Sequence, residues 1–212
     1  MANTILFYIL IFISIVLSIG YFVGRKKNRK IAFNAMEALK ELIKPEDQTI
    51  TNIGGVVGYH VEMEFKPSRN IKKLAGTITL LPRHSLLYLP ISKIYRKFDR
   101  FYMKIELKKL QEMSEIHFLA EPFLDKYRQN LKDNSKLKHK YEQFNGRKFC
   151  YVYKDESDLN LISGLVRSTA DKEYIKEISI NPNGEVAILI VPRTKGNKKI
   201  LEPIISWLQP ND

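Results

Sequence analysis

The sequence predicts an α+β protein: one N-terminal transmembrane helix followed by a single cytoplasmic α+β domain with a mainly antiparallel sheet. Three observations support this fold class. The run Ile5–Val23 has no charged side chain, several later segments alternate apolar and polar residues as half-buried strands do, and others space their apolar residues as helices do. We expect a transmembrane anchor with a basic flank at 1–30, an amphipathic juxtamembrane helix and glycine loop at 31–55, and the domain at 56–212.

The apolar run is the first element of the chain. A helix rises about 1.5 Å per residue and the hydrocarbon core of a bilayer is roughly 30 Å thick, so Ile5–Val23 is just long enough to span it. The cations that follow at once, and that we expect to contact lipid headgroups, are Arg25, Lys26, Lys27, Arg29 and Lys30. Because such clusters stay in the cytoplasm, we expect a single-pass protein with its N-terminus outside and its C-terminal domain cytoplasmic.

A cleaved signal peptide is the alternative interpretation of this segment, since Ser18 and Gly20 form a weak cleavage site. No basic region precedes the apolar run, however, and the run exceeds the ~7–15 residues of a signal peptide's apolar region. The cations behind the site would also hinder translocation. We therefore expect the helix to be retained as an anchor.

The segment after the anchor has helical spacing from Ile31 to Lys44, and Pro45 ends it, so the membrane helix can continue through the basic cluster into this segment. Glycines at 54, 55 and 58 then mark a loop. Alternating or apolar residues predict strands at Val57–Phe65, Leu74–Leu81, Phe101–Leu107, Ile116–Ala120, Phe149–Tyr153, Tyr174–Ile180 and Glu185–Val191. The last two flank an Asn-Gly corner, which favours a hairpin.

Four further segments are compatible with helices. Ser85–Tyr95 predicts a short helix interrupted near Pro90, and Pro122–Phe144 predicts a polar helix that Asn134-Ser135 can divide in two. Asp155 or Ser157 can cap a helix that runs to about Thr169. The apolar stripe of a last helix consists of Ile200, Leu201, Ile204, Ile205 and Leu208.

The composition suggests a reducing compartment and an anionic partner. The chain has 35 Lys and Arg against 23 Asp and Glu, for a net charge of +12, and the five charged residues before Ile31 are all basic, which leaves +7 for the rest. This charge suits anionic lipid, nucleic acid or a ribosome surface, although it also serves plain solubility. The single cysteine, Cys150, rules out an internal disulfide framework.

The chemistry of an enzyme is not apparent in these residues. The four histidines, at 60, 84, 117 and 139, lie far apart, with no Cys or His pair at metal-ligand spacing. The glycine loop lacks the strand, helix and Lys-Ser/Thr of a phosphate loop, and Cys150 lies in a strand-like segment without a nucleophile signature. We therefore expect no catalytic residue, no metal, no cofactor and no small-molecule substrate. A site assembled from dispersed residues remains the alternative.

Basic clusters are the better candidates for a binding surface. We name three of them. The first cluster lies among aromatic residues and consists of Lys93, Arg96, Lys97 and Arg100. The second cluster, in a polar region expected to be loop and helix, consists of Lys136, Lys138, Lys140, Arg147 and Lys148, and the C-terminal cations are Lys195, Lys198 and Lys199. Basic side chains can hold phosphates while aromatic rings stack, but the same pattern also fits core aromatics beside a solvated charged face.

One part of the chain resembles a known family. The segment Leu74–Leu87 (LAGTITLLPRHSLL) is similar to the cytosolic domain of the calumin family, the coiled-coil subunit of the PAT complex (protein associated with translocon). In that family a Gly-x-x-Ile-Thr-Leu strand meets a basic-polar turn and a Leu-Leu helix. A strand similar to Asp99–Leu107 follows, and the resemblance resumes at Tyr174–Val191. It covers most of Val57–Leu208, with gaps, as a pattern of short hydrophobic blocks.

The resemblance implies a non-enzymatic role in membrane-protein biogenesis. The expected partners are a protein-conducting channel, a translating ribosome and other small membrane subunits, which would help multi-span proteins insert and fold. The family's acidic luminal region and C-terminal coiled coil have no counterpart in this sequence, so we expect no luminal calcium binding, and the contacts made by the coiled coil are in doubt. The alternative function is a membrane-tethered module that binds anionic lipid or RNA without any translocon.

Overall fold

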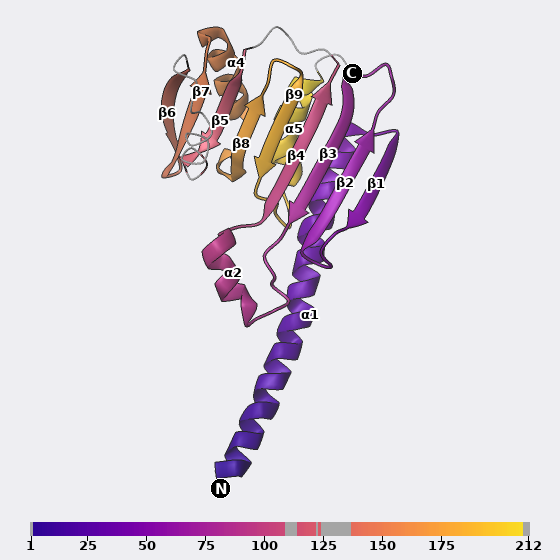
Figure 1. Cartoon of the computed structure of the whole chain (residues 1–212), viewed down its shortest axis with the longest axis vertical. Coiled ribbons are helices and arrows are strands. Elements are labelled where there is room, and N and C mark those ends of the chain that lie inside the picture. The colour runs from indigo at the N-terminus through magenta and orange to yellow at the C-terminus, as the bar shows by residue number, and fades with distance from the viewer. Residues whose placement is uncertain (1, 109–113, 122, 124–136, 210–212) are drawn as a thin grey trace.

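The computed structural model describes residues 2–108, 114–121, 123 and 137–209. Its first element, α1, is a single helix that covers Ala2–Ile43. Figure 1 shows the first half of α1 as a rod that projects from the rest of the molecule, while the second half lies behind a large sheet. The apolar run and the expected juxtamembrane helix are therefore parts of one continuous helix.

The described residues form a sheet of nine strands in the order β1-β2-β3-β4-β9-β8-β5-β7-β6, and each neighbouring pair is antiparallel. Their bounds are Asp47–Asn52 (β1), Gly58–Glu64 (β2), Ile71–Thr79 (β3), Arg100–Leu107 (β4), Ile116–Ala120 (β5), Lys138–Phe144 (β6), Arg147–Tyr153 (β7), Ile175–Ile180 (β8) and Glu185–Ile190 (β9). The remaining elements are α2 (Tyr88–Arg96), α4 (Glu156–Ser168), the 3₁₀ turn η1 (Lys172–Tyr174) and α5 (Asn197–Leu208).

The core lies between one face of the sheet and the helices α1, α4 and α5 (Figure 1). In β4, for example, Phe101, Met103 and Ile105 are fully buried, whereas Tyr102 between them is exposed. The core includes buried side chains of α1 from Ile31 to Ile43, of α4 and of α5. Since strand residues alternate between faces, the opposite face of the sheet carries most of the polar strand residues.

The structure bears out the α+β class, the helices on one face and most predicted strands. The β8–β9 hairpin turns at Gly184, which has the positive φ of 85° that an Asn-Gly corner favours. One prediction is wrong: the end of the expected helix at Pro122–Phe144 is the strand β6. Residues 122 and 124–136 of that expected helix lie outside the described residues. The strand β1, within the segment expected to hold the glycine loop, was not predicted.

Candidate membrane-proximal binding surface

A buried polar network joins α1 to the domain where the helix leaves the core. The Asn28 side chain is fully buried, and its Nδ2 donates a hydrogen bond to the Leu81 carbonyl at 2.9 Å. Its Oδ1 accepts one from Arg83 at 3.0 Å. Arg83 also pairs with Asp99 through two hydrogen bonds of 2.9 and 2.6 Å, and Asp99 accepts the Leu81 N–H at 2.8 Å. Three segments far apart in sequence are thereby fixed together.

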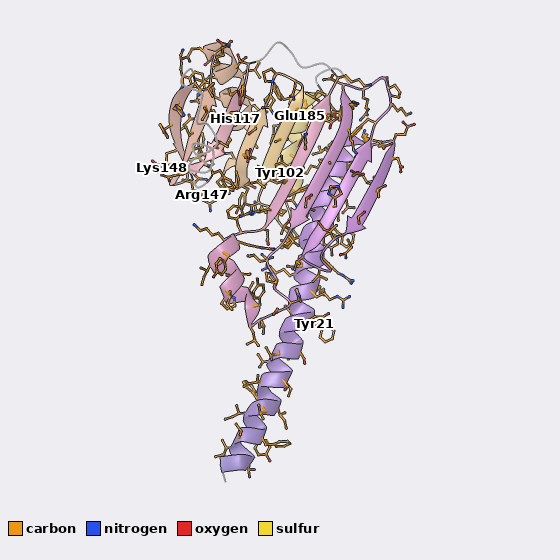
Figure 2. The ribbon with its side chains drawn as sticks, in the orientation of Figure 1. Tyr21, Tyr102, His117, Arg147, Lys148 and Glu185 are labelled. Carbon is orange, nitrogen blue, oxygen red and sulfur yellow. The ribbon has the colours of Figure 1, made fainter. Side chains whose placement is uncertain are left out.

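Two glycines of α1 allow the loop before α2 to pack against the helix. A Cβ built on Gly24 would overlap the backbone carbonyl of Arg83, and one built on Gly20 would overlap the Leu86 side chain. Tyr21, on the same stretch of α1 (Figure 2), packs edge-on against the His84 ring with centroids 6.0 Å apart. Gly20, Gly24 and Asn28 are spaced by four residues, which places them on one face of α1.

The helix α2 is exposed except at Leu89 and Ser92. Ser92 is buried, and its hydroxyl donates a hydrogen bond to the Leu89 carbonyl at 3.2 Å. Leu87, Ile94 and Tyr95 are 74, 73 and 80% exposed. The interpretation that the aromatic and apolar residues of this basic cluster belong to the core is therefore wrong for Ile94 and Tyr95. Phe101 is buried in the core, and Phe98 is half-buried. Three cations of the first basic cluster, Lys93, Arg96 and Lys97, are exposed beside this apolar surface.

The five cations of α1 predicted to contact headgroups lie between the apolar half of the helix and the core. Arg25 is half-buried, and the other four are exposed. Arg25, Lys26 and Arg29 line an open depression of ≈ 380 Å³ together with Phe22. The depression thus combines cations with one aromatic residue at the end of the apolar run, an arrangement suited to an anionic headgroup above an acyl chain.

The described members of the second cluster, which we call the hairpin cations, lie on β6 and β7, at the edge of the sheet opposite β1. Lys138 pairs with Glu156 at 3.4 Å, and Lys148 pairs with Glu121 at 3.7 Å, whereas Lys140 is exposed. By register, Lys138 and Lys140 share the helix-bearing face with Tyr151 and Tyr153, and Lys148 lies on the other face. Arg147 is the first residue of β7, and Lys136 lies outside the described residues. The hairpin cations therefore do not form a single patch.

The C-terminal cations lie in the loop before α5 and in its first turn. Lys198 pairs with Glu41 of α1 at 3.1 Å. Lys195 and Lys199 are exposed. The fourth basic residue near this loop, Arg193, pairs with Asp171 at 2.8 Å and stacks over the Tyr174 ring at 4.3 Å. The positions open to a partner are therefore Lys195 and Lys199.

Arg147 and Lys176 bring two cations to one backbone carbonyl. Arg147 Nη1 and Lys176 Nζ both donate to the Glu173 carbonyl, at 3.0 and 2.5 Å. Burial, together with the Arg147 charge, lowers the pKa of Lys176 from 10.5 to about 8. In Figure 2, Arg147 and Lys148 lie at the end of the sheet that faces the projecting half of α1. This end of the sheet is therefore electropositive.

The open face of the sheet carries paired rather than converging polar groups. Lys104 pairs with Glu185 at 2.6 Å, which raises the pKa of the lysine and lowers that of the carboxyl. His117 is largely buried, and burial lowers its pKa although Glu115 lies 2.9 Å from its Nε2. Within the described part of the chain, no three His, Cys, Asp or Glu side chains gather as a metal site would require.

Sequence reasoning missed the junction of α1 with the loop before α2. The contacts of Asn28, Arg83 and Asp99 join residues 16 to 55 positions apart, so no local pattern marks them. The four-residue spacing of Gly20, Gly24 and Asn28 was a usable signal, because small residues at this spacing allow another backbone to approach a helix. The sequence showed basic residues among aromatic ones at α2, but it did not show that the aromatic and apolar side chains there are exposed.

Among the described residues, one helix near the N-terminus is long and apolar enough to cross a membrane, and its most apolar stretch is not buried inside the protein. No protein-family model matches this sequence, and no curated protein is significantly similar to it.

Proposed function

We propose that this protein is a single-span membrane protein whose cytoplasmic domain is a non-enzymatic docking module at ribosome–translocon complexes, where it helps multi-span membrane proteins insert and fold. The observation that carries the docking role is the continuity of α1, which runs as one 42-residue helix from its apolar half into the core. A domain joined in this way stays at the bilayer surface. The calumin-like pattern at Leu74–Leu87 and Tyr174–Val191 supports the translocon in particular.

The proposed orientation has the N-terminus outside and the domain in the cytoplasm, because Arg25 to Lys30 contribute cations on one side of the apolar run. Cysteines introduced at Ala2 and at the exposed Lys140 test it by labelling from outside intact cells. Labelling at Ala2 and protection at Lys140 is the expected result. The reverse pattern would contradict the orientation and place the domain on the side of the membrane where ribosomes are absent.

The contacts that we propose for ribosomal RNA are the exposed cations Lys140 of β6 and Lys195 and Lys199 near α5. Phosphate contacts by lysine release counterions, so binding should weaken steeply as salt rises. The ion-paired Lys138, Lys148 and Lys198 would contribute less, since a carboxylate already compensates each charge. The exposed lysines are therefore expected to contribute more to ribosome binding than the ion-paired ones.

Co-sedimentation with ribosomes tests this function. The full chain in neutral nanodiscs should pellet with ribosomes at low salt, and Lys140→Glu with Lys199→Glu should reduce the pelleted fraction. The matched control is Lys66→Glu with Lys72→Glu, which reverses two exposed lysines of the β2–β3 turn region, at the end of the sheet away from the projecting helix. If the unaltered chain never pellets with ribosomes at low salt, the translocon function is wrong.

A second candidate function is a membrane-tethered module that binds anionic lipid. The exposed apolar and basic residues of α2 favour it, because they suit a bilayer surface more than RNA. Enrichment of phosphatidylglycerol among lipids that co-purify with the full chain, together with a failure to bind ribosomes, would select this candidate.

A further inference from the structure

The apolar residues on the outside of α2 form one continuous stripe. Leu87, Ile91, Ile94 and Tyr95 follow the spacing of a single helix face, and each of them is exposed. Soluble domains rarely leave such a stripe uncovered, and the other side of the helix already contacts the protein through the buried Ser92. The stripe therefore needs an apolar partner.

The contacts of the preceding loop determine how far α2 lies from the span. Leu86 lies against Gly20, within the apolar run of α1, and the Arg83 carbonyl lies against Gly24. Gly20 precedes the first cation, Arg25, by five residues, or about 7.5 Å along the helix axis. The headgroup region of a leaflet is about as thick as this. The start of α2 is therefore level with the boundary between acyl chains and headgroups (Figure 1).

The charges of α2 match an anionic surface at that level. Lys93, Arg96 and Lys97 flank the apolar stripe, and α1 carries its own cations, from Arg25 to Lys30, directly after the apolar run. Long basic side chains can reach phosphates while their stems lie along apolar surface. Tyr88 and Tyr95 add the aromatic residues that are enriched at membrane interfaces.

We propose that α2 is an interfacial helix: it rises beside α1 from the boundary of the acyl chains (Figure 1), with its apolar stripe against the bilayer and its cations at lipid phosphates. This inference rests on the proposed membrane span of α1 but not on ribosome binding. The domain then has two membrane contacts, and the Asn28–Arg83–Asp99 network sets the angle between them.

Fluorescent probes in vesicles of phosphatidylcholine and phosphatidylglycerol with brominated acyl chains test the proposal. An environment-sensitive dye is attached to the full chain at Ile94→Cys, at Phe12→Cys in the span, or at Ile50→Cys, an exposed apolar control on β1. The native Cys150 is buried and is left in place. The expected result is blue-shifted, quenched emission at positions 94 and 12, and water-like, unquenched emission at position 50.

The outcomes separate the two proposals. Quenching at position 12 without quenching at position 94 would overturn the interfacial helix and leave the span intact. Absence of quenching at position 12 would overturn the span and the interfacial helix together. The role of charge is tested by Arg96→Glu, matched with Lys72→Glu, in the presence of the probe at position 94. We expect loss of quenching in the first variant and not in the second, and equal quenching in both would refute the phosphate contacts.

Discussion

The two halves of α1 have similar apolar residues but opposite surroundings. Leu10, in the first half, is 56% exposed, whereas Leu39, in the second half, is fully buried against the sheet. Between them lie the cations from Arg25 to Lys30 and the buried Asn28. The comparison teaches that hydrophobicity alone does not assign an environment: most apolar side chains of the first half are exposed, whereas those of the second half pack in the core.

The largest expected difference comes from making the same substitution in both halves. Leu39→Ala should lower the free energy of unfolding by about 2–5 kcal/mol, because it leaves a cavity in the core. Leu10→Ala should change it by no more than about 0.5 kcal/mol, since this side chain has no packing partner to lose within the domain. Urea unfolding of the full chain in mild detergent, followed by the fluorescence of the half-buried Trp207, measures both. Equal changes in the free energy of unfolding for the two substitutions would contradict the difference between the two halves of α1.

The junction between the halves should be sensitive to the loss of one charge. Asp99→Asn removes the negative charge that pairs with Arg83 and one of the two oxygens that accept hydrogen bonds from it, and should cost about 2–3 kcal/mol. The exposed Glu37→Gln on α1 is the control, with little change expected. The same urea titration applies. If Asp99→Asn left the free energy of unfolding unchanged, the network would not join α1 to the domain.

Glycine substitutions should have opposite signs at two helical positions. Gly24→Ala should destabilise by about 1–3 kcal/mol, because the new Cβ overlaps the Arg83 carbonyl. Gly164→Ala, in α4 with open space around the added Cβ, should stabilise by about 1 kcal/mol through helix propensity. Thermal unfolding of the two variants in the same detergent gives the signs. Stabilisation by Gly24→Ala would mean that the loop does not pack against α1.

The last comparison is a pH dependence of stability, which we expect from the domain because Ile5–Val23 has no charged side chain. The unfolded chain keeps the Lys176 proton up to about pH 10.5, whereas the folded protein releases it near pH 8. The free energy of unfolding should therefore rise with pH between these values. Lys176→Met should flatten that rise in unfolding curves measured across the window. An unchanged rise would assign it to other groups.

The sequence predicted the elements whose apolar pattern is strong, and failed where structure depends on contacts between distant residues. The strands β4 and β9 alternate or are continuously apolar, and both were found. The edge strands β1 (DQTITN) and β6 (KHKYEQF) are polar, because an edge strand packs less of its surface, so neither showed the expected pattern. Lys residues on β6 fit this role at an exposed edge.

The candidate surface was predicted in its residue types rather than in its arrangement. The cations of α1 and α2 were visible in the sequence, but the position of α2 beside α1 depends on the loop packed against Gly20 and Gly24. The pairing of Lys138, Lys148 and Lys198 with carboxylates, which weakens three predicted contacts, is also a product of the fold.

The central claim, that lipid surrounds the first half of α1 and protein or water surrounds the second, is tested most directly by spin labels along this helix. The labels replace Phe12 and Ile19 in the first half and the exposed Phe33 and Lys40 in the second, with the full chain in bilayers. We predict high accessibility to oxygen and low accessibility to a water-soluble nickel complex at Phe12 and Ile19, with the reverse at Phe33 and Lys40. High nickel accessibility at all four positions would contradict the account.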